Sequence, residues 1–343
     1  MTTYAASEGE RDNRITSFVR ELFLSRGILP FVLVAAIILF GAIEPRFLGP
    51  ENAFNIARQS TFLMIVCMGQ MMTLLVRGID MSVGSTVALI SVVTSLVISG
   101  IIAAHPDAVV LAIAVGIAAA LATGMVMGAV HGISIAYFNV NPFIMTVGTQ
   151  FIAFGIALKL SGGVPIYGLP PAFSTYFVYM RPWGIPMPAF LAAGVFIIMY
   201  FILNWTKLGR HIYAIGGDPT ASHLAGIHTK RVMIVAYIMC SVMVAFAGVL
   251  LTARTESGEA TLGGTLLLDS IAAVVIAGVS LFGGIGKVGN VIFGALFVTL
   301  VTNGMNLIRI DSYTQQIVLG LILIGAVLAD RVRMRILRQT PVE

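Results

Sequence analysis

Residues 86–130 read TVALISVVTSLVISGIIAAHPDAVVLAIAVGIAAALATGMVMGAV. Two apolar runs, 86–104 and 108–130, flank the polar break His105-Pro106-Asp107, and neither run contains a charged residue. A helix of about 20 apolar residues crosses the hydrocarbon core of a bilayer. Because the runs are continuous and do not alternate with a period of two, they argue against β-barrel strands. The stretch therefore predicts two membrane-spanning helices joined by a tight turn.

The rest of the 343-residue chain has the same character. Hydrophobic residues make up 58% of it and charged residues only 10%, against about 25% charged residues in a typical soluble domain. So few charges cannot cover this much apolar surface in water. The composition excludes a soluble enzyme, a secreted disulfide scaffold and a disordered chain. The predicted fold class is an all-α polytopic membrane protein.

Apolar ranges recur along the chain and predict about ten transmembrane helices. They are 28–43, 61–76, 86–104, 108–130, 142–160, 188–203, 232–252, 269–282, 288–308 and 314–329. The polar stretch 44–60 is expected to hold at most a short surface helix. The chain divides into an N-terminal tail (1–27), a membrane domain (28–330) and a basic C-terminal tail (331–343).

The distribution of Lys and Arg predicts the orientation. With the N-terminus in the cytoplasm, 14 of these residues fall in inside segments and 5 in outside segments, with Lys159 at a span end. This bias agrees with the positive-inside rule and places both termini in the cytoplasm. The net charge of +5 is then explained by contact with anionic lipid head groups, and no nucleic-acid partner is expected.

The chain shows no sign of covalent chemistry. Cys67 and Cys240 lie in apolar runs and are expected to be buried packing residues. The five histidines are scattered, and none forms a cluster with Cys or carboxylates at metal-binding spacing. No nucleophile stands beside a base. We therefore expect no catalytic residue, no metal and no cofactor.

The segment Gly78–Ser85 (GIDMSVGS) places a carboxylate between glycines in an otherwise apolar hairpin. Ionisable groups are costly in membranes and tend to be functional. One interpretation is a capped helix start, in which Ser82 or Ser85 caps the following span and Asp80 complements its dipole. The other is a direct role of Asp80 in transport.

The segment Leu281–Gly289 (LFGGIGKVG) superficially resembles a phosphate-binding loop, but it lacks the required glycine spacing and the Ser or Thr after Lys287. We interpret it as a tight glycine turn. Its faint likeness to Gly78–Gly84 suggests paired broken helices. It also suggests the hypothesis that Asp80 pairs with Lys287.

The segment 204–231 is the most polar internal loop of the chain. Asp218 is placed to cap a short helix, with Pro219 at its first position and Gly226 at its end. A bare connector would need only a few residues. The segment indicates either a docking element for a soluble partner or an amphipathic surface helix, although its Ala, Ser and His content suits lipid poorly.

Other polar and aromatic groups each have two interpretations. The amides in the spans are Gln70, Gln150, Asn303, Asn306, Gln315 and Gln316. They either hydrogen-bond a solute in a pathway or join helices to one another. The aromatic residues of the outer loop 161–187 form either an interfacial belt or part of a gate. The Gly124-x-x-x-Gly128 spacing predicts close contact between two helices.

Several of these segments together resemble one known family. Gly78–Ser85 resembles the glycine–aspartate–serine signature of ribose-type ABC transporter permeases, in the wider group of ribose, xylose, galactose and autoinducer importers. Further blocks match in order: Asn141–Thr149, Ser161–Ile166, Gly216–Ile227, Ala277–Gly286 and Asn303–Asn306. The resemblance covers about residues 28–330. The chain departs from the pattern at Arg77, where a second glycine is common, and at Asp218, Ser222 and His223.

The resemblance implies a large, roughly ten-helix importer fold of the type II kind in a bacterial inner membrane. It implies three protein partners: a periplasmic binding protein that delivers a sugar or related solute, a second permease subunit, and a separate cytoplasmic ABC ATPase. The implied ATPase-coupling residues are Gly217, Asp218, Ala221, Leu224 and Gly226. The implied candidates for the translocation path are Gln70, Asp80, Ser82, Asn303 and Asn306.

Two other function classes remain open. An ion-coupled secondary transporter would need intramembrane carboxylates, for which Asp80 and Asp269 are the candidates, each at a span end. A membrane-embedded enzyme would need a convergent catalytic cluster, and the sequence offers none. The amides and aromatics suit any hydroxyl-rich solute, so they do not select a substrate.

Overall fold

The computed structural model describes residues 29–339, with side chains to residue 328. The predicted N-terminal tail 1–27 and the last four residues of the C-terminal tail lie outside the described residues. The helices are α2 (Leu29–Ile43), η1 (Pro45–Leu48), α3 (Pro50–Leu75), α4 (Val83–Ala104), α5 (Val109–Phe138), α6 (Pro142–Ser161), α7 (Pro171–Ser174), η2 (Thr175–Tyr179), η3 (Pro182–Gly184), α8 (Met187–Trp205), α9 (Lys207–Gly217), α10 (Pro219–Leu224), α11 (Thr229–Thr255), α12 (Leu266–Ile276), α13 (Val288–Leu307) and α14 (Ser312–Gln339).

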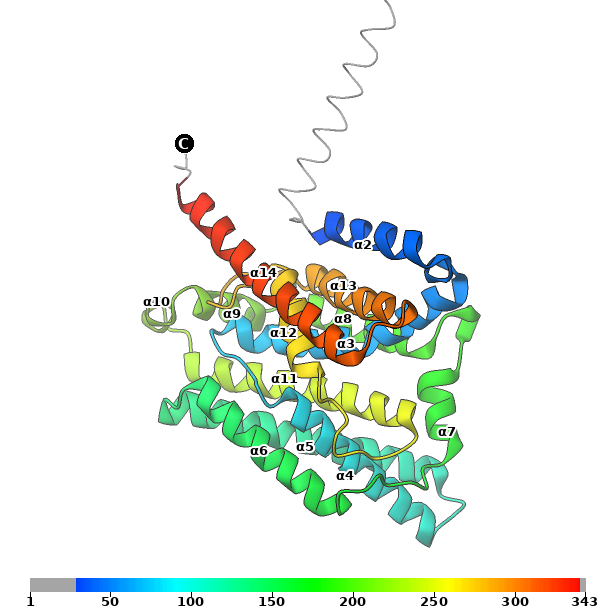
Figure 1. Ribbon diagram of the computed structural model, residues 1–343. Coiled ribbons are helices and arrows are strands. Elements are labelled where there is room, and N and C mark those ends of the chain that lie inside the picture. The colour runs from blue at the N-terminus through cyan, green and yellow to red at the C-terminus, as the bar shows by residue number, and fades with distance from the viewer. Residues whose placement is uncertain (1–28, 340–343) are drawn as a thin grey trace, which may run out of the picture.

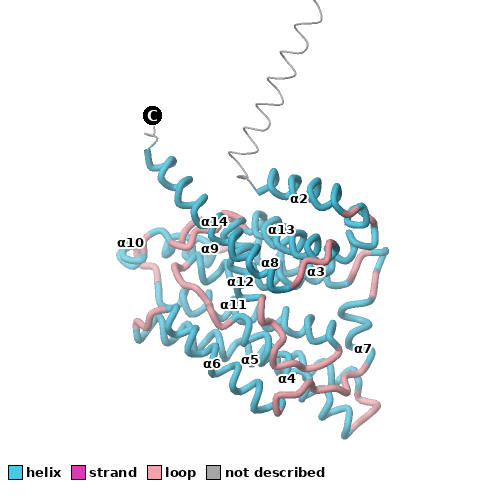
Figure 2. The backbone as a smooth tube through the Cα atoms, in the orientation of Figure 1, coloured by secondary structure: helices cyan, strands magenta, loops and turns pink. Residues whose placement is uncertain are grey.

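The helices pack around α3 and α11 (Figure 1). Helices α4, α5 and α6 lie on one side of this pair, and α2, α13 and α14 lie on the other. The side chains of α3 are almost all buried from Ser60 to Leu75, as expected for a helix surrounded by others. Figure 2 shows helices throughout, and the only strand-like pairing in the described part is the isolated bridge between Ile166 and Gly258.

Six of the described helices are long and apolar enough to cross a membrane, and they confirm a multi-pass all-α membrane protein. They are α4, α5, α6, α8, α11 and α13. This criterion of helix length and hydropathy does not support the predicted count of about ten spans. Helices α2 and α12 are apolar but shorter, and so is the apolar part of α14. With 11 residues, α12 cannot span a core about 30 Å thick by itself.

The Gly124-x-x-x-Gly128 spacing does mark a close helix contact. A Cβ atom on Gly128 would lie 2.5 Å from Cα of Ile238 and 2.6 Å from the carbonyl oxygen of Tyr237. Gly124 and Gly132 approach α11 in the same way, one turn to either side. Glycines at this spacing let two helix backbones approach within van der Waals contact, so α5 and α11 form one rigid pair.

Four predicted boundaries are wrong. The eighth span, predicted as 269–282, ends at Ile276, and the tenth, predicted as 314–329, continues as α14 to Gln339. The stretch 44–60 is not a separate surface helix, because α3 begins at Pro50 and continues without a break to Leu75. A proline suits the first helical position, which needs no N–H. The fourth span does not end at residue 130, because α5 continues to Phe138. Because α5 is longer than predicted, His131 lies within the helix and not after its end.

Candidate functional site

The segment between α3 and α4 turns into the interior of the bundle and carries Asp80. Gly78 donates its N–H to the Thr73 carbonyl at 2.8 Å, and a Cβ at this position would overlap the Tyr237 hydroxyl. Only a glycine therefore lets the chain pass here. Two residues later, Asp80 is only 1% exposed. A carboxylate buried so deeply requires polar partners.

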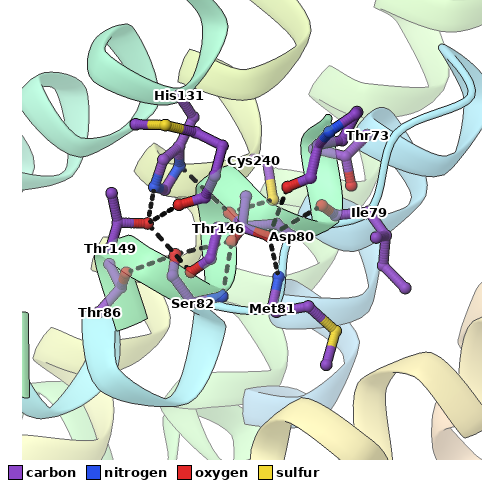
Figure 3. Close-up of polar contacts among 12 residues, drawn as sticks. Thr73, Ile79, Asp80, Met81, Ser82, Thr86, His131, Thr146, Thr149 and Cys240 are labelled. Atoms are coloured by element: carbon purple, nitrogen blue, oxygen red, sulfur yellow. Dashed lines mark hydrogen bonds and ion pairs between the residues drawn. The ribbon is translucent and has the colours of Figure 1, made fainter. Parts of the chain in front are cut away.

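Those partners come from the same turn and from two distant helices (Figure 3). Oδ1 of Asp80 accepts hydrogen bonds from the Ser82 N–H at 2.8 Å and from the Ser82 hydroxyl at 2.6 Å. Oδ2 lies 3.7 Å from Nδ1 of His131 on α5 and 3.8 Å from Sγ of Cys240 on α11. The carboxylate thus joins three separate parts of the chain.

The His131 ring extends this network to α6. Nε2 of His131 lies 2.6 Å from Oγ1 of Thr149, and the Thr146 hydroxyl accepts the Met81 N–H at 3.0 Å. We call Asp80, Ser82, His131, Thr146, Thr149 and Cys240 the Asp80 cluster. Because its members come from the turn before α4 and from α5, α6 and α11, a movement of any one of these elements would strain the contacts of the others.

The cluster corrects two expectations. Neither serine side chain caps α4, since Ser82 donates to Asp80 and the Ser85 hydroxyl donates to the Ser82 carbonyl. Asp80 does not pair with Lys287, because within the described part of the chain the one basic side chain that approaches its carboxylate is His131, with Nδ1 3.7 Å from Oδ2. The contact between His131 and Asp80 is one that the sequence did not predict. His131 lies 51 positions from Asp80 in the sequence, so no spacing rule could find the pair. A polar residue next to an apolar run was the one available signal.

A second candidate region is formed by α9 and α10, at one end of the bundle (Figure 1). Asp218 caps α10 as predicted, accepting the N–H groups of Thr220 at 2.8 Å and Ala221 at 3.0 Å. Gly226 follows the helix with φ of +82°, a conformation that favours glycine. Leu224 is 82% exposed. The segment therefore presents an uncovered apolar side chain on a short, well-capped helix.

The carboxylate of Asp218 is held in its charged form. Its pKa lies below the ordinary value because it accepts the Ala221 and Thr220 N–H groups, and the nearby positive charge of Arg77 lowers it further. A charged carboxylate also complements the positive end of the α10 dipole. The cap is consequently present throughout the neutral range.

Comparison with known proteins decides the family. The model of the branched-chain amino acid transport system / permease component family matches residues 52–327. The ribose import permease protein of Escherichia coli K12 is 35% identical over 301 residues, covering 87% of this chain and 91% of the relative. The ribose import permease protein of Bacillus subtilis is 36% identical, covering 88% and 92%. The D-allose transport system permease protein of E. coli K12 is 34% identical, covering 88% and 90%.

The chain belongs to the ABC sugar-importer permease family. The similarity covers most of this chain and most of each relative, so it includes the Asp80 cluster, α9 and α10. No solved structure matches the permease.

The amides of the permease divide between the two interpretations. Gln70 is fully buried and neither its Oε1 nor its Nε2 has a hydrogen-bond partner, and Oδ1 of the buried Asn303 has none. Asn306, by contrast, accepts a hydrogen bond from Gln315 of α14 at 2.8 Å. The Asn306–Gln315 contact joins α13 to α14, whereas Gln70 and Asn303 retain unused hydrogen-bonding capacity.

The opposite end of the permease carries a small polar pocket of about 110 Å³. Its lining includes Glu51, Asn55, Arg58, Tyr179 and Arg181. The guanidinium of Arg181 also lies over the ring of Phe54, 5.8 Å from its centroid. The pocket is formed by α3 and the segment from η2 to α8, and α3 connects it to the turn that carries Asp80.

Proposed function

We propose that this chain is the transmembrane subunit of an ABC importer that forms the path for a sugar or sugar-like solute. The observation that carries this proposal is the similarity to ribose, allose and galactose permeases over most of the chain. In the proposed complex a periplasmic binding protein delivers the solute, and a second permease subunit completes the path. A separate cytoplasmic ATPase supplies the energy, so this subunit needs no nucleotide site and no cofactor.

The proposed topology has about ten spans of a type II-like importer fold within residues 28–330. The shorter apolar helices α2 and α14 would add to the six long ones, and α3 would pass through the middle of the bundle. Helix α12 would form a span only together with the segment that follows it. The excess of Lys and Arg in alternate loops supports cytoplasmic termini in a bacterial inner membrane. In this orientation α9 and α10 face the cytoplasm, and the polar pocket lined by Arg58 and Arg181 faces the binding protein.

The proposed ATPase-coupling element is the segment 204–231. Its contact residues are Gly217, Asp218, Ala221, Leu224 and Gly226. The exposure of Leu224 and the Asp218 cap support this role, because a soluble partner would cover the apolar side chain and the cap would keep α10 folded when the partner leaves.

The proposed path residues are Gln70, Asp80, Ser82, Asn303 and Asn306. Gln70 and Asn303 are the candidates for direct contact with the solute, since buried amides without partners can hydrogen-bond sugar hydroxyls. Asp80 and Ser82 already bond to each other, and Asn306 to Gln315. These three would shape the path through the positions of α4, α13 and α14.

The proposal is tested by uptake into vesicles that contain this chain, using a panel of labelled sugars and polyols. Vesicles are prepared with and without the ATPase, the binding protein and ATP. We expect uptake only when all three are present, and the solute that responds identifies the substrate. Uptake by the chain alone under an ion gradient would overturn the proposal and indicate an ion-coupled secondary transporter.

Gly226→Val is expected to lower uptake while leaving membrane insertion unchanged. A Cβ at Gly226 meets open space, so the effect comes from forcing a β-branched residue to φ of +82°, which costs about 1–2 kcal/mol. The strain would displace α10 from the ATPase. Gly163→Val is the matched control, since Gly163 has φ of +77° and open space in the loop between α6 and α7. Wild-type uptake by Gly226→Val would contradict the docking role.

Asp218→Ala is expected to lower uptake by removing the α10 cap, whereas Asp218→Asn should retain most of it because asparagine caps helices equally well. The pH dependence follows from the lowered pKa. A carboxylate whose folded pKa is depressed stabilises the fold above its unfolded pKa and loses this effect as pH falls through the folded value. The ratio of wild-type to Asp218→Ala uptake should therefore stay constant from about pH 8 to about pH 5. A ratio that falls toward one in this range would show that the cap is not responsible.

A further inference from the structure

Three segments meet next to the Asp80 turn, and their backbones are in direct contact. They are the end of α3 (Leu75–Gly78), the end of α9 (Tyr213–Gly217) and the turn 283–286 before α13. Gly284 donates its N–H to the Leu75 carbonyl at 3.1 Å, and the Tyr213 hydroxyl donates to the Gly286 carbonyl at 2.8 Å. We call these three segments the junction. It connects α9 to α3 and α13 without using any residue of the Asp80 cluster.

The side chain of Arg77 connects two of the junction segments by hydrogen bonds. Its Nε donates to the Gly216 carbonyl at 2.8 Å, and its Nη2 donates to the Gly217 carbonyl. The last carbonyls of a helix have no partner within the helix, so the guanidinium fork satisfies two of them at the end of α9 and complements the negative end of its dipole. The positive charge also lies near Asp218. One side chain thus binds the C-terminal end of α9 and stabilises the cap of α10.

The backbone at Arg77 and the glycines around it make the junction stiff. Arg77 has φ of +63°, a conformation that costs energy for any residue with a Cβ. A Cβ on Gly216 would overlap the Leu75 carbonyl oxygen and the Gly284 nitrogen. A Cβ on Gly283 would lie 2.5 Å from Cγ of Arg77. Backbones in direct contact transmit displacement because no side chain between them can yield.

We propose that Arg77 is a positioning residue that transmits movement of the coupling segment to the Asp80 turn. The inference rests on the proposed role of α9 and α10 in ATPase docking. When the ATPase displaces α9, the Gly216 and Gly217 carbonyls pull on the Arg77 guanidinium. Arg77 lies three residues before Asp80, and Gly78 between them packs against Tyr237 of α11. A pull on Arg77 is therefore applied to the segment that holds the carboxylate of the cluster.

The test compares Arg77→Gly, Arg77→Lys and Gly216→Ala in vesicles reconstituted with the ATPase and binding protein. Arg77→Gly removes the guanidinium without backbone strain, because glycine adopts positive φ freely. Arg77→Lys keeps the charge but loses the fork. Gly289→Ala is the control for Gly216→Ala, since a Cβ on Gly289 meets nothing within 4 Å. Solute uptake and ATP hydrolysis are measured on the same vesicles, and amide hydrogen exchange is measured on the permease alone.

We expect Arg77→Gly to hydrolyse ATP at close to the wild-type rate while the solute moved per ATP falls about tenfold, equivalent to about 1.4 kcal/mol of lost coupling. Gly216→Ala should show the same separation, Arg77→Lys a smaller one, and Gly289→Ala none. Amide exchange at 213–218 and 283–286 should rise in Arg77→Gly. A merely structural role would lower uptake and hydrolysis in proportion, which would overturn the inference.

Two further outcomes separate this inference from the proposed function. Unchanged amide exchange in Arg77→Gly would show that the junction does not depend on Arg77, whatever the transport assay gives. Raised exchange with an unchanged ratio of uptake to hydrolysis would show that the contact exists but carries no coupling. A wild-type chain that takes up solute without ATP would instead overturn the proposed function itself, while the exchange data would still decide whether Arg77 ties α9 to α3.

Discussion

Asp80→Ala is expected to abolish uptake and to lower the thermal stability of the permease. The substitution leaves the Ser82 N–H without its acceptor and removes the carboxylate that lies 3.7 Å from Nδ1 of the fully buried His131. Each buried polar group left unpaired costs about 1–3 kcal/mol. Because the carboxylate joins the turn to α5 and α11, the loss also loosens elements that must move together. Uptake in vesicles and thermal unfolding in detergent measure the two effects.

Two variants make the Asp80 test specific. Asp80→Asn keeps an oxygen that accepts from Ser82 but removes the negative charge opposite His131, so it should retain more stability than Asp80→Ala. Asp107→Ala removes an exposed carboxylate between α4 and α5 that makes no hydrogen bond within the described part of the chain, and should change stability by less than about 0.5 kcal/mol. Wild-type stability and uptake in Asp80→Ala would show that the cluster is not needed.

Gly128→Val is expected to lower the thermal stability of the permease strongly. A Cβ there would lie 2.5 Å from Cα of Ile238, and backbone atoms cannot move aside without separating the two helices. Overpacking in a well-packed core typically costs about 1–3 kcal/mol. The additional methyl groups of valine increase the separation that is required. The measurement is the temperature at which the detergent-solubilised permease loses its monodisperse peak in size-exclusion chromatography.

The matched control for Gly128→Val is Gly155→Val in the neighbouring helix α6. A Cβ on Gly155 meets nothing within 4 Å, and the residue is exposed on the surface of the bundle. Both variants place valine in the middle of an apolar helix, so they share the same loss of helix propensity. A similar loss of thermal stability in the two would show that propensity, not the contact between α5 and α11, explains the effect.

Local features of the chain were readable from the sequence alone. The Asp218 cap, the end of the short helix at Gly226 and the close contact at Gly128 are confirmed by the structure. Each depends on residues within about four positions of one another, where capping, turn geometry and helix spacing act. The spans were placed by apolar content, which is also a local property. The errors fell at boundaries such as residue 130, since helices in a membrane protein can continue past an apolar run when another helix covers them.

The sequence by itself determined that this is an all-α membrane protein of the sugar-importer permease family, because composition and ordered motifs depend on the chain and not on its packing. Only the tertiary structure decided which partners Asp80 has, and that Arg77 reaches the carbonyls of α9. Residues 80, 131 and 240 are brought together by the packing of α5 and α11, which depends on glycine contacts and burial summed over the whole bundle. Contacts between residues so far apart in the sequence produce no periodic pattern of residue types.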